Sequence, residues 1–240
     1  MPQTVALFIP CLVDQLYPEI GMRMANVLRR AGVQVEYDQR QTCCGQPAFN
    51  TGYRDEARRV AEHFLDIFAG KEAIVAPSGS CVAMVRNFYP TLFANHARLA
   101  EATALGQHVF EFSEFLVKRL GVTALGARFP HKVFFHNSCH SYRELRLQNE
   151  PLTLLRNVQD LQLLETNEEP VCCGFGGLFS FKFAPIASSM AASRLQRYEA
   201  LGAEAIVTND PGCLMQMRRE AQSQRSGLQI LHLAEVLDRT

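Results

Sequence analysis

The stretch Glu72–Cys81, EAIVAPSGSC, is written a second time as Glu204–Cys213, EAIVTNDPGC. In both copies a short apolar run is followed by turn-forming residues and ends on a cysteine. The apolar runs, residues 73–76 and 205–207, have the β-branched composition of a buried strand, and the proline and glycine after them are typical of a loop. The sequence therefore predicts a copied unit in which a thiol follows the carboxyl end of a strand.

The remaining cysteines repeat in the same register. Each copy carries one early cysteine, one Cys-Cys-Gly segment and one late cysteine, and counterparts lie 128 to 132 residues apart. A single free cysteine is more often core filler than a ligand, but a repeated set of eight predicts two copies of one thiol site. The set is Cys11, Cys43, Cys44 and Cys81 in the first copy and Cys139, Cys172, Cys173 and Cys213 in the second.

The length of the repeat predicts two domains. A chain of 240 residues with a repeat of about 130 matches two cores of ordinary domain size. We place the first domain at residues 1–121 and the second at residues 132–240, with the weakly structured stretch Val122 to His131 between them. Both are predicted to be cysteine-rich α/β domains.

The charge balance and the hydropathy pattern restrict the expected partners and location of the protein. The 24 basic and 24 acidic residues balance, with no long run of either sign, so nothing favours nucleic acid or an anionic membrane as a partner. No apolar run approaches the roughly 18 residues of a membrane span, and Val5 to Val13 lacks the flanks of a signal peptide. We therefore expect a cytoplasmic protein, in which thiols serve as metal ligands or redox groups and not as disulfides.

Short apolar runs alternate with helix-period stretches, the pattern of βαβ units with a parallel sheet. Strands are predicted at Val5 to Ile9, Val33 to Tyr37 and Ala73 to Ala76, and helices at Pro18 to Ala31 and Arg54 to Phe68. The expected fold class is α/β, with two duplicated Rossmann-like domains. Because carboxyl ends of parallel strands share one edge, four thiols per domain should converge there.

Four converging thiols have three uses in such a protein: an iron–sulfur cluster, a structural zinc site or a dithiol redox centre. Zinc sites usually contain C-x₂₋₄-C and thioredoxin-like centres C-x-x-C, and neither spacing occurs in this chain. An iron–sulfur cluster accepts long gaps between ligands, which favours it. The adjacent cysteines are harder to accommodate, because neighbouring side chains diverge, so the other two uses stay open.

At this point the chain resembles a known family. Its Cys, Cys-Cys-Gly and Cys spacing is similar to that of the tandem CCG domains, the cysteine-rich domains found in heterodisulfide reductase and in the glycolate oxidase iron–sulfur subunit. The segments 43–48, 77–81 and 172–177 most resemble the lactate utilization protein A family. The resemblance implies an iron–sulfur subunit of a multi-protein system that oxidises L-lactate to pyruvate, with one cluster, [4Fe–4S] in type, per domain.

The chain departs from that family at one place in each copy. The heterodisulfide reductase ends each site on C-x-x-C, which gives five thiols, whereas Ser78 and Asp210 stand here at the position of the first cysteine. The five-thiolate cluster therefore does not transfer. A four-cysteine cluster, or one completed by an oxygen of Ser78 or Asp210, remains open, as does metal binding in only one half.

Two histidines and two glycines complete the candidate site. His136 and His140 bracket Cys139, whereas the first copy has Phe8 and Leu12 there, so the histidines are candidates for a catalytic base or for hydrogen bonds to a cluster. Gly45 and Gly174 are expected to supply a positive φ after the double cysteine, next to the cofactor.

The expected function is electron transfer. Oxidation of a 2-hydroxy acid releases two electrons while a cluster carries one, and no nucleotide-binding fingerprint is present, so other subunits of a lactate-oxidising complex are the expected partners, and the substrate would reach this chain only through them. The alternatives are a self-contained thiol–disulfide reductase, with Cys43 and Cys44 or Cys172 and Cys173 as attacking thiols, and a zinc-bound structural protein.

Overall fold

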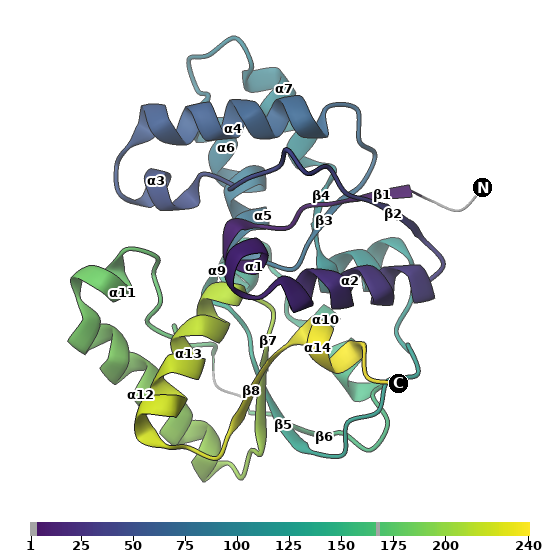
Figure 1. Ribbon diagram of the computed structural model, residues 1–240, viewed down its shortest axis with the longest axis vertical. Coiled ribbons are helices and arrows are strands. Elements are labelled where there is room, and N and C mark those ends of the chain that lie inside the picture. Colours follow the sequence, from purple (N-terminus) through teal and green to yellow (C-terminus); the bar gives the residue numbers. More distant parts are fainter. Residues whose placement is uncertain (1–3, 167–168) are drawn as a thin grey trace.

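The protein is described by a computed structural model in which residues 4–166 and 169–240 are placed. It contains two four-stranded, all-parallel sheets, each flanked by helices (Figure 1). The strand orders, β2-β1-β3-β4 and β6-β5-β7-β8, are the same when one copy is laid on the other. The predicted fold class is therefore confirmed: the chain is an α/β protein made of two copies of one Rossmann-like unit.

The first copy occupies the upper part of Figure 1. Its strands fall where the alternating and apolar runs predicted them. The elements are β1 (Thr4–Leu7), α1 (Cys11–Leu16), α2 (Pro18–Arg30), β2 (Gln34–Glu36), α3 (Gln46–Asn50), α4 (Arg54–Phe68), β3 (Ile74–Ala76), α5 (Gly79–Ala83), the π-helix η1 (Met84–Phe88), α6 (Tyr89–Leu92), α7 (Leu99–Gly106), β4 (Val109–Glu111), α8 (Phe112–Glu114) and the π-helix η2 (Phe115–Arg119).

The second copy occupies the lower part of the same view. Its elements are β5 (Lys132–His136), α9 (Cys139–Arg143), α10 (Asn149–Arg156), β6 (Gln162–Leu164), α11 (Phe179–Lys182), α12 (Ala184–Ala200), β7 (Ala205–Thr208), α13 (Pro211–Gln224), β8 (Gln229–His232) and α14 (Leu233–Leu237).

Local sequence explains where the long helices begin and end. Helix α2 has Pro18 in its first turn, where a missing N–H costs nothing, and the chain leaves it through Gly32 at φ +87°. Its predicted apolar face, which includes Ile20, Met24 and Leu28, is fully buried. Burial of this face against the sheet, more than helix propensity, holds the helix in place.

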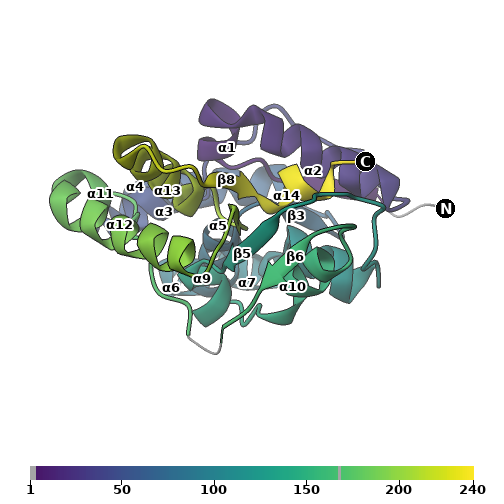
Figure 2. The ribbon, with the colours of Figure 1, turned by 90° about the horizontal axis from the view of Figure 1, so that it is seen from below.

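The two copies pack against each other reciprocally. Helix α2 of the first copy lies along α14 of the second, as Figures 1 and 2 show. Helix α10 of the second copy packs on α8 and η2 of the first. The helices that follow the early and late cysteines also pair across the interface, α1 with α13 and α5 with α9. Phe112 and Phe115 share one continuous core with Leu154 and Leu155. The cysteine-bearing ends of both sheets are therefore held face to face.

The stretch between the copies carries one isolated bridge, from Arg128 to Gln159. Ala127 and Phe129 are buried in the shared core, and the Arg128 N–H donates to the Arg239 carbonyl at 2.8 Å. This segment therefore packs on the second copy. The domain limits at 121 and 132 stay a prediction.

Across residues 4–166 and 169–240, none of the helices combines the length and the apolar character needed to cross a bilayer.

Candidate metal centres

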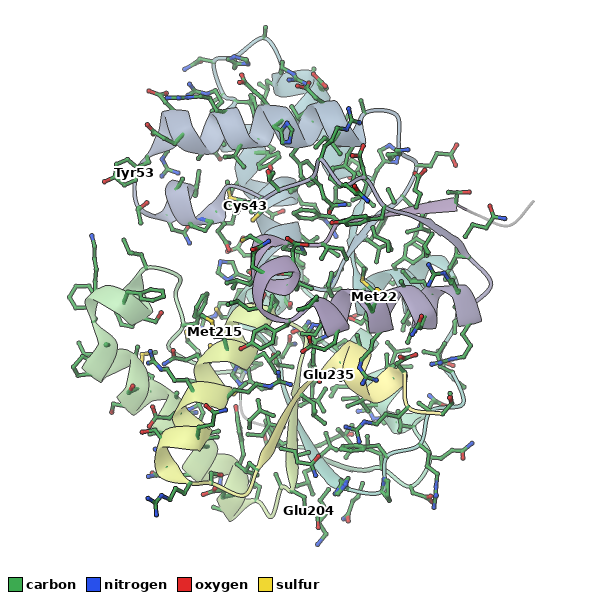
Figure 3. The ribbon with its side chains drawn as sticks, in the orientation of Figure 1. Met22, Cys43, Tyr53, Glu204, Met215 and Glu235 are labelled. Carbon is green, nitrogen blue, oxygen red and sulfur yellow. The ribbon has the colours of Figure 1, made fainter. Side chains whose placement is uncertain are left out.

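All eight cysteines line one cleft of about 580 Å³ between the two copies. Each follows the carboxyl end of a strand, as the fold predicts: the early and late cysteines lie in first turns of helices, and the double cysteines lie in loops. In Figure 3 Cys43 lies in the interior of the molecule, and Tyr53 and Met215, which also line the cleft, lie toward its opening. Exposed apolar side chains, among them Tyr53 and Phe181, form the rim.

The four thiols of the first copy contact one another in sequence. Cys11 Sγ lies 3.5 Å from Cys43 Sγ. Cys43 also hydrogen-bonds to the Cys44 thiol, which in turn hydrogen-bonds to Cys81. Cys44 and Cys81 are buried and the other two are half-buried. Residues 11, 43, 44 and 81 therefore form one compact group, which we call the first thiol site.

The second copy repeats the arrangement. Cys172 hydrogen-bonds to the thiols of Cys139 and Cys173, and Cys173 Sγ lies 3.0 Å from Cys213 Sγ. The burial pattern is the same as in the first copy, with the second cysteine of the pair and the late cysteine buried. Residues 139, 172, 173 and 213 form the second thiol site. All eight cysteines are free thiols.

The glycine after each double cysteine turns the backbone toward a sulfur atom. Gly45 has φ +83° and Gly174 has φ +85°, the positive values expected from the sequence. This turn lets each glycine N–H donate to the sulfur of the first cysteine of its pair, Cys43 or Cys172, at 3.4 Å. A Cβ at Gly174 would lie 2.6 Å from the Ala187 carbonyl oxygen, so the position has no room for a side chain.

These contacts favour the thiolate form of one sulfur in each site. The hydrogen bond from Cys11, and then that from Cys44, lowers the pKa of Cys43 to about 3. Hydrogen bonds from Cys139 and Cys173 likewise lower the pKa of Cys172 to about 2. The pKa of a donating thiol shifts in the opposite direction: the hydrogen bond to Cys43 raises the pKa of Cys11 above its usual range. Because the thiolate is the form of cysteine that binds a metal, Cys43 and Cys172 are suited to be metal ligands.

Ser78 and Asp210 form a contact between the two copies. The Ser78 hydroxyl accepts from the Cys81 N–H at 3.3 Å, and so caps α5. One Asp210 oxygen accepts from the Gly212 N–H at 3.0 Å and caps α13, while the other accepts from the Ser80 N–H of the first copy at 2.8 Å. Both Asp210 oxygens are thus engaged by backbone N–H groups. A ligand role for Ser78 or Asp210 remains a prediction.

His136 ends β5 and is buried beside the second thiol site. Its Nδ1 lies 2.7 Å from the Tyr198 hydroxyl. Its Nε2 has no hydrogen-bond partner within residues 4–166 and 169–240. A ring nitrogen of His136 forms with Cys173 Sγ and Cys213 Sγ a group whose atoms all lie within 4.8 Å of one another. Burial lowers the pKa of His136 to about 4, so the imidazole is neutral at pH 7.

His140 lies in the cleft and links the two copies. Its Nδ1 is 3.7 Å from Cys139 Sγ and its Nε2 is 3.4 Å from the amide nitrogen of Gln46. Gln46 also donates to the Ser80 carbonyl at 3.2 Å. The structure therefore brings both predicted histidines next to the thiols, in different surroundings: His136 is buried and His140 faces the cleft.

Tyr198 and Gln46 also belong to the site, although the cysteine pattern does not point to them. Tyr198 lies on α12, far from any cysteine in the sequence. Comparison of the two copies could have pointed to Tyr198. Their alignment places Tyr198 opposite Phe68, so the second copy has a polar hydroxyl where the first copy has an apolar ring. No signal of this kind accompanies Gln46.

The donor set is suited to a metal or an iron–sulfur centre. Four thiols lie in mutual contact, backbone N–H groups point at sulfur, and a buried imidazole nitrogen at the second site lacks a partner within the described part of the chain. Thiolates are the ligands of such clusters, and N–H groups directed at their sulfurs tune the reduction potential.

Comparison with known proteins agrees with the site. The cysteine-rich (CCG) domain family matches residues 5–86 and 133–218, which contain all eight cysteines. Lactate utilization protein A of Bacillus pumilus is 40% identical over 234 residues, covering 98% of each chain, and that of Halalkalibacterium halodurans is also 40% identical, covering 98% of this chain and 96% of the other. Among solved structures, glutamate racemase RacE1 of Bacillus anthracis covers 99% of this chain and 79% of its own with a TM-score of 0.42 and 8% identity, too low to carry an argument.

Proposed function

This chain belongs to the cysteine-rich (CCG) domain family and to the lactate utilization protein A family within it, and from that premise we propose that it is an iron–sulfur electron-transfer subunit of a system that oxidises L-lactate to pyruvate. Each copy would hold one cluster, of the [4Fe–4S] type, on its four cysteines. The system would operate in the cytoplasm, where reduced thiols persist.

The observation that carries this proposal is the convergence of eight free thiols on one cleft. The sites stand on the carboxyl edges of two sheets that the reciprocal helix packing holds face to face. Two one-electron centres so arranged could together accept the pair of electrons that a 2-hydroxy acid releases.

The chain's own residues hold the centres and shape their surroundings. Residues 11, 43, 44 and 81 would bind the first cluster, and residues 139, 172, 173 and 213 the second. Gly45 and Gly174 direct N–H groups at sulfur. When bound, the clusters supply one-electron redox chemistry.

The proposed oxidation of lactate requires partner proteins. The sequence has no nucleotide-binding fingerprint, so the group that takes the hydride or electron pair from lactate belongs to another subunit. The exposed apolar rim of the cleft, with Tyr53 and Phe181, is where such a partner could bring its own centre close.

The cluster assignment is tested by chemical analysis. The full chain, purified without oxygen, should be brown and contain about eight iron and eight acid-labile sulfide per chain, since two four-iron centres are proposed. A colourless protein with zinc, or with no metal, would contradict the assignment.

The electron-transfer assignment is tested by turnover. The cluster-loaded chain alone, given L-lactate and an artificial electron acceptor, should not produce pyruvate, and activity should appear when its partner proteins are added. Pyruvate formation by the isolated chain would move the catalytic site into this protein, with His136 and His140 as the first candidates for the base.

One observation favours a second candidate, a thiol–disulfide reductase. Cys173 Sγ and Cys213 Sγ are only 3.0 Å apart, which suits a dithiol that closes to a disulfide. Such a protein would be colourless, and it would reduce a disulfide substrate without iron. A zinc-bound structural protein would also be colourless but would reduce nothing.

A further inference from the structure

The two thiol sites differ at one pair of positions behind the cysteines. In the first copy Phe8, at the end of β1, packs edge-on against Phe68 of α4, with ring centroids 5.7 Å apart and planes at 75°. In the second copy His136, at the end of β5, packs edge-on against Tyr198 of α12, with centroids 6.0 Å apart and planes at 64°. The geometry is kept, and an apolar pair is replaced by a polar one.

The equivalence of Phe68 and Tyr198 can be established without reference to His136. In each copy the Cys-Cys-Gly glycine packs on the backbone of one alanine of the long helix, Ala57 in the first copy and Ala187 in the second. Phe68 and Tyr198 each lie eleven residues after that alanine. The phenylalanine pair and the His136–Tyr198 pair are therefore structural counterparts.

A polar pair is costly at this place. His136 is 2% exposed and Tyr198 is 5% exposed, while Phe8 shows that an apolar ring fits the same position. The Tyr198 hydroxyl is the partner of Nδ1 only, and a buried imidazole nitrogen without a partner destabilises the fold. The ring is also held in one orientation by the 2.7 Å contact to Tyr198, as an outer hydrogen bond holds a metal-binding histidine.

A ring nitrogen of His136 lies within 4.8 Å of two sulfurs of the second thiol site, Cys173 Sγ and Cys213 Sγ. Because Nδ1 is engaged by the Tyr198 hydroxyl, Nε2 is the nitrogen left to bind a metal there. Nitrogen and thiolate sulfur together are a common ligand set for iron and zinc. We propose that His136 Nε2 is a nitrogen ligand to the metal of the second site, which makes that site a five-donor, mixed nitrogen and sulfur centre while the first has four thiols only. This inference rests on the proposed metal-binding function.

The consequence is that the two centres have different reduction potentials. A nitrogen donor added to four thiolates gives the second centre a ligand set that the first centre lacks, and the ligand set is one of the factors that fix the potential of an iron–sulfur centre. The duplication thus provides two unequal carriers.

The experiment uses the full chain, reconstituted with iron and sulfide without oxygen and labelled with ¹⁵N-histidine. Pulsed electron paramagnetic resonance of the reduced protein should show a strong coupling to a directly bound imidazole nitrogen. His136→Phe, and the double variant with Tyr198→Phe that rebuilds the Phe8–Phe68 pair, should abolish that coupling and shift the potential of one of the two centres while leaving the other unchanged. The double variant guards against loss of folding, because the first copy already folds with this pair.

The matched control is His140→Gln, which removes the other histidine beside Cys139 and should keep the strong coupling. A wild-type protein that binds iron but shows no nitrogen coupling, or only the weak coupling of a hydrogen bond, would overturn the ligand assignment while leaving the proposed function standing. A chain that binds no iron would overturn the proposed function, and this inference with it.

Discussion

At the scale of single residues, Asp210 shows how one side chain joins the two copies. It is 4% exposed, and it caps α13 through the Gly212 N–H and accepts from the Ser80 N–H of the other copy. The sequence leaves an oxygen ligand open at this position, and the structure shows a residue that fixes the relative placement of two cysteine-bearing helices.

Asp210→Ala should therefore destabilise the fold by about 2–4 kcal/mol, because two buried N–H groups lose their acceptor. Urea unfolding followed by circular dichroism measures the loss. Asp55→Ala is the matched control, since Asp55 is exposed and its ion pair with Arg58 at 3.0 Å should contribute less than about 1 kcal/mol. Equal midpoints for the two variants would contradict the role assigned to Asp210.

Glu111 is a second buried carboxylate, at the end of β4. It caps α8 by accepting from the Ser113 and Glu114 N–H groups at 2.7 and 3.1 Å, and it also contacts the Ser113 hydroxyl. The other oxygen has no partner within the described residues. Burial, assisted by the nearby Glu114 charge, raises the pKa of Glu111 from 4.5 to about 8. Arg86 neutralises Glu114 at 2.7 Å.

The raised pKa gives a pH dependence with a definite sign. Between pH 4.5 and about pH 8 the folded state keeps a proton that the unfolded state releases, so the free energy of unfolding falls as pH rises, by at most about 1.4 kcal/mol per pH unit. Glu111→Gln should lack this dependence. The difference in unfolding free energy between Glu111→Gln and wild type should grow from pH 5 to pH 8, and parallel curves would show that Glu111 is charged in the fold.

At the scale of elements, the interface depends on the close approach of α5 and α9. A Cβ built on Gly79 would lie 1.8 Å from Ser141 Oγ, and Ser141 is fully buried and hydrogen-bonded to Ser138 and Asn209. The serine therefore has little freedom to move away. This contact sets how far apart Cys81 and Cys139 lie.

Gly79→Ala should cost about 1–3 kcal/mol of stability, because the two helices must separate or shift. Gly227→Ala is the control, since nothing lies within 4 Å of a Cβ there and its φ is ordinary. Thermal unfolding of both variants measures the difference. If both unfold at the same midpoint temperature as wild type, α5 packs less closely on α9 than the structure shows.

At the scale of the whole molecule, two sites share one cleft but each is built by one copy. The four thiols in mutual contact come from the same copy in both cases. Hydrogen bonds between the copies, such as that from the Ser80 N–H to Asp210 and the contact of Gln46 with His140, do not involve the thiols. Each centre should therefore assemble independently.

Cys44→Ser with Cys81→Ser should remove about half of the bound iron and leave the second centre's spectrum intact, because effects at separate sites are roughly additive. Cys173→Ser with Cys213→Ser is the mirror-image variant and should remove the other half. Loss of all iron from either variant would instead mean that the eight thiols hold a single shared centre.

The duplication, the two parallel sheets and the thiol set follow from the order of residues along the chain. Short apolar runs before cysteines fix strands because burial and β-branched side chains act locally, and parallel strands necessarily bring their carboxyl ends to one edge. The positive φ of Gly45 and Gly174 was also predictable, since the backbone must turn after a double cysteine.

How the copies meet depends instead on contacts between residues far apart in the sequence. Such contacts pack α2 on α14, bring Asp210 to Ser80 and pair His136 with Tyr198. Hydrophobic periodicity states which face of a helix is buried but not what buries it, because the hydrophobic effect is not directional. The shared cleft, and the difference between its two sites, therefore emerge only when both copies are placed in space.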